Sequence, residues 1–293
     1  MELLVEWFSA NSISILNGVA RGMLLFLMAA GLSLIFGLGD VLNLAHGGMF
    51  LIGSYVGWQF LSTGGPFAVA VVAAIAMGAL LGVGLTATVR PIEGRGHLDQ
   101  ALVTLGASFV IAGTLSMIFG DDYKSVRPPA ALQGGFSFFG QTYPIYRASV
   151  IAVGLVVAAL LYLLVERTRF GAIVRAAVAD RDMVSAMGVN VRAVLIGVFI
   201  LGSALATVAG LLGAPILSVR PGVDEDVLLL ALIVVVIGGL GSLKGAFVGA
   251  VVIGQVQSLG IALFPQFAAF ALFGSMALVL LLRPTGLFGV SKS

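Results

Sequence analysis

The sequence predicts an all-α fold, a polytopic integral membrane helical bundle with about eight or nine spans or re-entrant segments. Of its 293 residues, 60% are hydrophobic and only 10% are charged, whereas a soluble domain carries about a quarter charged residues. Long apolar stretches recur along the whole chain, and a crossing helix takes roughly 20 apolar residues. Residues 1–293 are therefore expected to form a single transmembrane domain in a lipid bilayer.

Nine apolar segments are predicted to form these spans. Each approaches the length that a helix needs to cross the hydrocarbon core. The seventh and eighth are separated only by a short polar stretch around Lys244, so they form either two short spans or one re-entrant hairpin. In chain order, the segments cover about 12–36, 41–60, 66–89, 101–119, 147–165, 193–214, 227–243, 246–263 and 267–282.

The distribution of basic residues predicts the orientation. Lys and Arg concentrate in cytoplasmic loops, and the loop 166–192 holds five arginines. Alternation from this loop places ten Lys and Arg residues inside and four outside, with Arg21 in the first span. The N-terminus is then outside and the C-terminus cytoplasmic. The loop 120–146 becomes the longest external segment, which is either a folded cap that docks a partner or a plain connection.

A polar, glycine-rich stretch between two apolar runs, residues 31–48, is the most informative local feature, and we call it the polar interruption. Irregular backbone at membrane depth is tolerated only inside protein or along a wet cavity. Asp40, Asn43 and His46 recur every three residues, so they share a face if the stretch is helical. Asp40 is expected at the cytoplasmic boundary. Asn43, His46 and Gly47 either line a substrate pathway or serve structure by hydrogen bonding and packing.

A second break, residues 238–245, is rich in glycine, and we call it the glycine interruption. Broken helices in both halves of a transporter are the best sequence indication of a binding site, so Gly239 and Gly241 join the pathway candidates. Close helix packing is the alternative, and we favour it for most glycines. Glycines at helix-contact spacing occur as the pairs Gly18 and Gly22, Gly78 and Gly82, and Gly245 and Gly249.

Two short amphipathic helices fit the basic loop, residues 166–192. Each groups apolar residues on one face, and Gly188 is a natural C-terminal cap for the second helix. Such helices either dock in a groove on a soluble partner or lie on lipid headgroups. The apolar groups are Ile173, Ala176 and Ala177 in the first helix, and Met183, Ala186 and Met187 in the second, which begins at Asp182.

Three separated stretches carry a family resemblance. They are Asn43-Leu-Ala-His46-Gly47, the loop segment 170–190, and the glycine-rich residues 238–249 together with the ending 282–289. In this order they resemble the LivH/LivM-type permeases, the membrane subunits of branched-chain amino-acid ABC importers. The likeness covers nearly the whole chain and implies the fold of an ABC importer permease.

The resemblance implies a permease subunit that translocates branched-chain amino acids, or a related small solute, in a bacterial inner membrane. The implied partners are two cytoplasmic ATPase subunits, a second homologous permease and an external solute-binding protein. The loop is similar to the family's coupling motif, although residues 182–188 keep an acid and a glycine and lose both alanines. The implied ATPase-coupling residues are Gly171, Arg175, Asp180, Asp182, Met187 and Gly188.

Composition and motifs bound the alternatives. The chain lacks a phosphate-binding loop, so ATP hydrolysis is expected in another polypeptide. Two histidines, no cysteine and scattered carboxylates predict no catalytic set, no metal site and no cofactor, and the dispersed arginines predict no nucleic-acid partner. Two alternatives remain: an ABC permease for urea, amides or aromatic acids, and a stand-alone secondary transporter or channel for a small polar solute.

Overall fold

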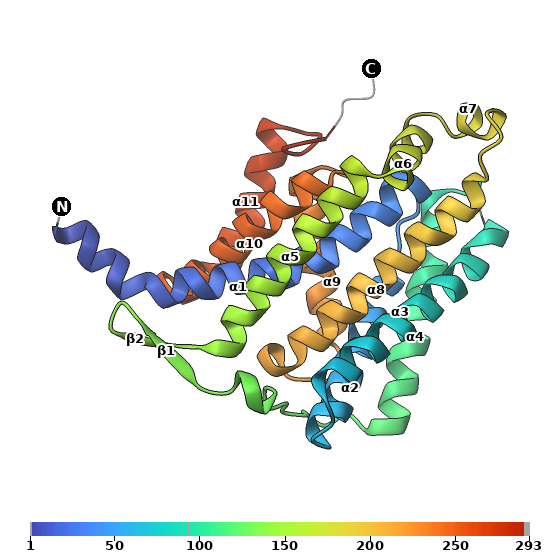
Figure 1. Ribbon diagram of the computed structural model, residues 1–293. Coiled ribbons are helices and arrows are strands. Elements are labelled where there is room, and N and C mark those ends of the chain that lie inside the picture. Colours follow the sequence, from blue (N-terminus) through green and yellow to red (C-terminus); the bar gives the residue numbers. More distant parts are fainter. Residues whose placement is uncertain (1, 93, 290–293) are drawn as a thin grey trace.

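The computed structural model describes residues 2–92 and 94–289, and its regular structure is almost entirely helical (Figure 1). All nine predicted segments are confirmed as helices, with ends that differ by a few residues, except that the first helix starts well before its predicted span. They are α1 (Glu2–Gly39), α2 (Ala45–Ser62), α3 (Phe67–Val89), α4 (His97–Phe119), α5 (Ile145–Arg167), α8 (Val191–Leu217), α9 (Val223–Gly238), α10 (Leu243–Leu263) and α11 (Ala268–Leu282).

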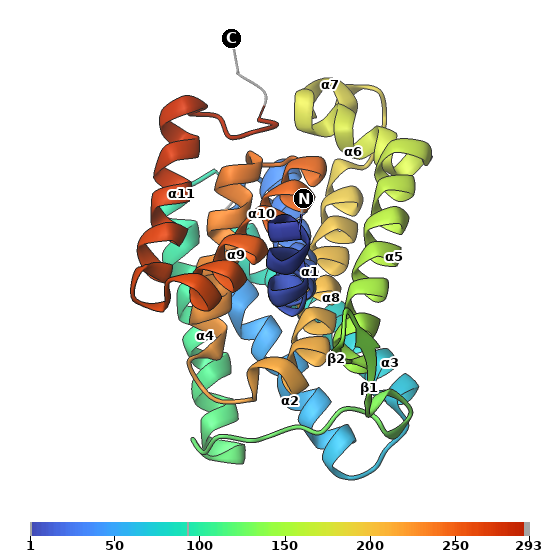
Figure 2. The same ribbon diagram turned by 90° about the vertical axis from the view of Figure 1, so that its left-hand side faces the viewer.

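The shorter elements mark the two ends of the bundle. After α5 come α6 (Arg169–Ala179) and α7 (Arg181–Ala186), and before it β1 (Gly135–Phe138) pairs with β2 (Gln141–Pro144) in an antiparallel hairpin. Figures 1 and 2 show these two groups at opposite ends of α5, which we call the α6–α7 end and the hairpin end. Single turns of 3-10 helix complete the described structure: η1 (Arg90–Ile92), η2 (Ala130–Leu132) and η3 (Pro265–Phe267).

The centre of the bundle is formed by α1 and α8. Helix α1 packs against α5, α8, α9 and α10, while α8 packs against α1, α2 and α3. Glycines allow these helices to approach closely: a Cβ on Gly22 would lie 2.9 Å from the Ala250 carbonyl oxygen, and one on Gly82 would lie 2.7 Å from that of Phe199. The packing interpretation of the glycine pairs is therefore confirmed for α1 with α10 and for α3 with α8.

Seven helical stretches among the described residues are long and apolar enough to cross a membrane, and α2 and α9 are not among them. Helix α9 has 16 residues, so it is roughly 24 Å long, less than the ~30 Å of bilayer hydrocarbon. The outer helices α4, α5 and α11 expose large apolar side chains, as a bundle surrounded by lipid requires. The predicted pair 227–263 is thus one short helix and one helix of spanning length.

The two short helices meet at their first turns. A Cβ on Gly47, near the start of α2, would lie 2.9 Å from the backbone oxygen of Asp224 at the start of α9. From there α9 leads to Gly241, which lies against Gly37 near the end of α1. Helix α2 leads the other way, and its Tyr55 ring stacks 5.0 Å from the ring of Phe119. Each short helix therefore occupies only part of the bundle's length.

The segment 120–146 is folded at the hairpin end. Its strands place Gly135 opposite Pro144, and the Tyr143 side chain is fully buried. Lys124 is held to Val219, after α8, by backbone hydrogen bonds of 2.9 and 3.0 Å in both directions. The segment is thus more than a plain connection, and its external position remains an expectation from the sequence.

Candidate functional site

Within the polar interruption, the backbone leaves the helix at Gly39 and resumes it at Ala45. The expectation that Asp40, Asn43 and His46 share a helical face is wrong, because residues 40–44 are not helical and Asp40 has a positive φ of 52°. Asp40 is exposed at the α6–α7 end, with a carboxylate oxygen 3.8 Å from Nε2 of His97. It therefore lies apart from the other two side chains, which turn into the protein.

Asn43 and His46 are both completely buried. Nε2 of His46 lies 3.1 Å from the Met28 carbonyl oxygen of α1, and Gly31 leaves room for the ring, since a Cβ there would lie 3.0 Å from Cε1. Nδ1 of His46 and both polar atoms of the Asn43 side chain have no hydrogen-bond partner among the described residues. Leaving such a buried group unpaired costs about 1–3 kcal/mol, so packing alone does not explain these side chains.

Thr104 of α4 holds the irregular backbone of the polar interruption. Its Oγ1 accepts a hydrogen bond of 3.1 Å from the Leu44 N–H and lies 3.1 Å from the Leu42 carbonyl oxygen. Freed backbone groups at membrane depth are thereby satisfied from a neighbouring helix. Sequence reasoning did not single out Thr104, because a threonine in an apolar span is an ordinary contact between helices.

Asp224 is a second residue that the sequence did not single out. The run 224–226 has the composition of a solvated helix start, yet Asp224 is only 3% exposed while Glu225 and Asp226 are exposed. Oδ1 of Asp224 accepts a hydrogen bond of 3.0 Å from the Gly222 N–H. The junction of α2 and α9 therefore combines a buried carboxylate with two helix N-termini, which carry partial positive charge.

In the glycine interruption, backbone atoms fill the space between α9 and α10. Gly239 and Gly241 have positive φ values of 100° and 78°, which let the chain turn from α9 into α10. The carbonyl oxygens of Ile237 and Gly238 accept hydrogen bonds of 2.8 and 3.0 Å from the N–H groups of Leu287 and Phe288. Gly239 lies against this C-terminal segment, whereas Gly241 is exposed and faces Gly37.

The basic loop forms the two predicted helices, α6 and α7. Thr168 caps α6 by accepting a hydrogen bond of 3.1 Å from the Gly171 N–H, and Asp180 caps α7 by accepting one of 2.9 Å from the Met183 N–H. The second helix thus begins after Asp180 and not at Asp182. Gly188 has a positive φ of 82° and lies beyond its C-terminal end, as predicted for a C-terminal cap.

The two helices differ in what they expose. Helix α6 buries Gly171, Val174 and Ala177, whereas Ala176, which the spacing groups with Ile173 and Ala177, is exposed. In α7 only Val184 is buried. The predicted group in the second helix, Met183, Ala186 and Met187, is exposed. Met183 is 60% and Met187 is 75% exposed, so the group forms an apolar surface at the α6–α7 end.

Glu166, at the end of α5, ties this loop to the glycine interruption. One carboxylate oxygen lies 3.7 Å from a guanidinium nitrogen of Arg175 in α6, and the other lies 3.2 Å from Nζ of Lys244 in the first turn of α10. Nζ of Lys244 also lies 5.7 Å from the centre of the Tyr162 ring. Glu166 therefore links α6 to the start of α10 through two partly exposed ion pairs.

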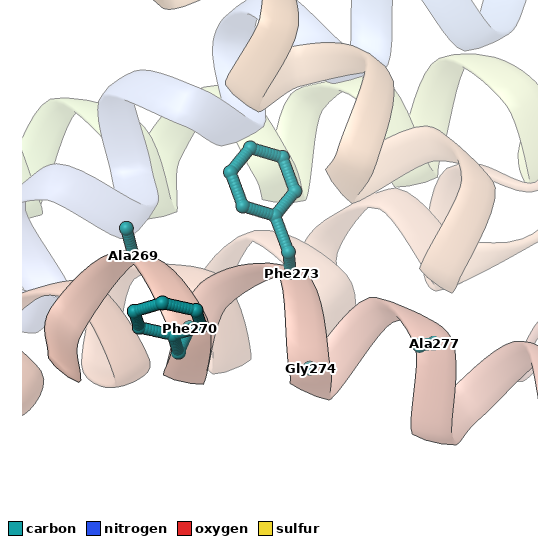
Figure 3. Close-up of a pocket in the computed structure, with 5 residues that line it drawn as sticks. All are labelled: Ala269, Phe270, Phe273, Gly274 and Ala277. Carbon is teal, nitrogen blue, oxygen red and sulfur yellow. The ribbon is translucent and has the colours of Figure 1, made fainter.

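An apolar groove of about 470 Å³ lies elsewhere, on α11 (Figure 3). Its lining residues all belong to that one helix, and it collects none of the candidate residues above. They are Ala269, Phe270, Phe273, Gly274 and Ala277.

Fold and composition together define a multi-pass helical membrane protein. Residues 14–282 match the family described as "Branched-chain amino acid transport system / permease component", and the chain belongs to this family. This confirms the resemblance seen in the sequence.

Relatives match along nearly their full lengths. The high-affinity branched-chain amino acid transport system permease protein BraD of Pseudomonas aeruginosa is 29% identical, with 94% of each chain covered. The high-affinity branched-chain amino acid transport system permease protein LivH of Escherichia coli is 28% identical, over 93% of this chain and 94% of its own. Among solved structures, PsaBC from Streptococcus pneumoniae in complex with Fab matches with a TM-score of 0.48 and 15% identity, over 91% of this chain and 89% of that one.

Proposed function

We propose that this chain is the membrane-spanning subunit of an ATP-driven importer for branched-chain amino acids or a closely related small solute. The observation that carries the proposal is the full-length relationship to BraD, at 29% identity over 94% of both chains. The proposed partners are two cytoplasmic ATPase subunits, a second homologous permease and an external binding protein that delivers the solute. The proposed setting is a bacterial inner membrane, with the hairpin end outside and the α6–α7 end in the cytoplasm.

The junction of α2 and α9 is proposed as part of the substrate pathway. Helix N-termini attract carboxylates, and a buried carboxylate such as that of Asp224 attracts an ammonium group. The junction thus offers complementary partners for the two charges of a zwitterion. The unpaired amide of Asn43 and Nδ1 of His46 supply further polar groups close to the start of α2. Gly47 keeps the two first turns close together, and Gly239 and Gly241 provide the turn at the far end of α9.

The α6–α7 pair is proposed to grip an ATPase subunit. Its exposed methionines offer an apolar surface with a charged rim, which includes Asp180 and Asp182. Gly171 sets the tight turn from α5 into α6, and Arg175 joins α6 to Glu166. Gly188 ends α7 and so limits the surface that docks.

Uptake by sealed membrane vesicles tests the transport function. Vesicles that contain the chain with its copurifying subunits are supplied with the binding protein, ATP and labelled leucine, isoleucine or valine. We expect ATP-dependent uptake that excess unlabelled leucine suppresses. Uptake by this chain alone, driven by an ion gradient without ATP, would contradict the proposal and support a secondary transporter. Uptake of urea, amides or aromatic acids in place of leucine would support the alternative, an ABC permease for those solutes.

Cross-linking tests the coupling role, and the natural chain contains no cysteine that would interfere. Met187→Cys is placed on the exposed surface of α7, and Met117→Cys, at a site that is 91% exposed near the hairpin end of α4, is the matched control. We expect cross-links to an ATPase subunit from position 187 and none from position 117. A scan of α6 and α7 that yields no cross-link to an ATPase would rule out the proposed grip.

A further inference from the structure

A small polar pocket of about 190 Å³ lies between α1, α5 and α10, towards the hairpin end. Helix α1 runs between the other two helices (Figures 1 and 2). Two arginines, Arg21 and Arg147, contribute to its lining, and both are half-buried. The remaining lining residues are Ser14, Asn17, Ser258, Ile261 and Ala262.

Among the described residues, neither guanidinium group has a negatively charged partner. The ion pairs formed among the described side chains involve neither Arg21 nor Arg147. Arg147 donates a hydrogen bond to the side-chain oxygen of Asn17, which is neutral, and its like charge acts unfavourably on that of Arg21. Like charges held together in a partly desolvated pocket are destabilising unless an anion joins them.

The described groups next to the two arginines add no negative charge. Ser258 donates its hydroxyl to the Ser14 carbonyl oxygen over 2.7 Å. Burial raises the pKa of Tyr143 to about 12, with the charge of Arg147 opposing the shift, so this nearby phenol is neutral at physiological pH. Its hydroxyl has no hydrogen-bond partner among the described residues. The surroundings of Arg147 therefore remain positive.

The depth of the pocket matches a bilayer interface. Arg21 precedes the end of α1 at Gly39 by eighteen residues, a rise of roughly 27 Å, which is close to the thickness of the hydrocarbon core. Arg147 lies in the first turn of α5 and Ser258 in the last turns of α10. Ile261 of the lining and its neighbours Leu263 and Phe264 are exposed and apolar. With the end of α1 at one face of the bilayer, phosphate groups of the opposite monolayer would lie at this level, with acyl chains alongside.

We propose that the pocket formed by Arg21, Arg147 and Asn17 binds a phosphate oxyanion, either the headgroup phosphate of a phospholipid or free phosphate. Arginine matches phosphate geometry with two parallel N–H donors, and two arginines balance the charge of a phosphate dianion and exceed that of a phosphodiester monoanion. The amide nitrogen of Asn17 supplies a neutral donor. The anion would remove the repulsion between the two guanidinium groups and link α1, α5 and α10 at this end of the bundle.

Two measurements on the full chain, purified with its accompanying subunits, test the proposal and separate the two sources. Native mass spectrometry counts phosphatidylglycerol molecules retained after detergent extraction. Thermal unfolding in phosphatidylcholine nanodiscs, with and without inorganic phosphate, detects a free anion. Each is done for R21Q, R147Q and R127Q, because Arg127 is an exposed arginine near the hairpin end outside the pocket. R21K retains the charge and serves if R21Q does not fold.

Removal of either pocket arginine is expected to weaken binding about tenfold, whereas R127Q binds as the natural chain does. Retention of phosphatidylglycerol that R21Q and R147Q lose identifies a lipid headgroup. A rise in unfolding temperature with phosphate that these variants lose identifies a free anion. If R21Q and R147Q, or R147Q alone where R21Q does not fold, match the natural chain in both measurements, or if the natural chain shows neither effect, the proposal is overturned. A carboxylate of a partner subunit filling the pocket would give that last result.

Discussion

The polar interruption and the glycine interruption break the helical bundle in opposite ways. In the first, side chains enter the space that the helix leaves, and Asn43 and His46 are buried with polar atoms that lack partners. In the second, glycines let backbone fill the space, and the C-terminal segment hydrogen-bonds to the carbonyl groups at the end of α9. The two breaks touch through Gly37 and Gly241.

The difference lies in which polar groups are paired. In the glycine interruption, carbonyl groups at the end of α9 are paired with the C-terminal segment. In the polar interruption, Thr104 bonds the backbone of Leu42 and Leu44, yet polar side chains remain unpaired at a cost in stability. Strain and unpaired groups that packing does not require tend to cluster at functional sites.

The largest effect is expected from Gly245→Ala in the glycine interruption. The new methyl group would overlap the carbonyl oxygen of Gly238, and backbone on both sides leaves nothing flexible to yield. We expect a loss of about 3 kcal/mol in the free energy of unfolding, measured as a fall in unfolding temperature of the purified protein.

Gly84→Ala is the matched control, because a Cβ at Gly84 in α3 meets nothing within 4 Å. This change is expected to leave stability the same or to raise it by up to about 1 kcal/mol, through better helix propensity. Equal stability of the two variants would show that α9 and α10 do not pack as closely as described here.

The next largest effect is expected from Asn43→Leu in the polar interruption, and this change is expected to raise the free energy of unfolding. Replacing an unpaired buried amide by an apolar group of similar size is expected to raise stability by about 1 kcal/mol. Uptake of the labelled solute is expected to fall severely, because the pathway loses its polar group. Thr114→Val, which removes a hydroxyl bonded within α4 itself, is expected to alter neither quantity.

If Asn43→Leu transports normally with raised stability, the Asn43 amide is not required for transport. One that loses stability would reveal hydrogen bonds that the buried amide makes in the membrane. Either result would remove the distinction between the two interruptions.

Much of this architecture followed from hydropathy, because segments that cross a bilayer must be long and apolar. Positions that depend on contacts between distant segments did not follow. The three-residue spacing of Asp40, Asn43 and His46 predicts a shared helical face only if the helix continues, and Thr104, sixty residues away, holds the backbone in another form. Asp224 likewise looks solvated in sequence, yet it is buried where the start of α9 meets Gly47 of α2, a contact between segments far apart in the chain.

A smaller effect is expected from Glu166→Gln, which tests whether the glycine interruption responds to α6. The carboxylate joins Arg175 and Lys244 but is partly exposed, so its loss is expected to cost less than about 1 kcal/mol of stability. Solute-stimulated ATP hydrolysis by the assembled importer is expected to fall several-fold, while basal hydrolysis stays constant. Asp99→Asn, which changes an exposed acid in the first turn of α4, is the control. Unchanged stimulation would separate α6 from the glycine interruption.

The smallest effect is expected from Asp40→Asn, and it completes the contrast within the polar interruption. The carboxylate of Asp40 is 65% exposed and lies 3.8 Å from His97, a separation and exposure at which ion pairs contribute little. Asparagine also tolerates the positive φ of 52° at this position, so stability and uptake are both expected to stay unchanged. Asp40→Val, which opposes that backbone conformation, is expected to cost about 1–2 kcal/mol. Loss of uptake in Asp40→Asn at full stability would instead make the charge of Asp40 functional, and the pathway would then extend from Asn43 to the α6–α7 end.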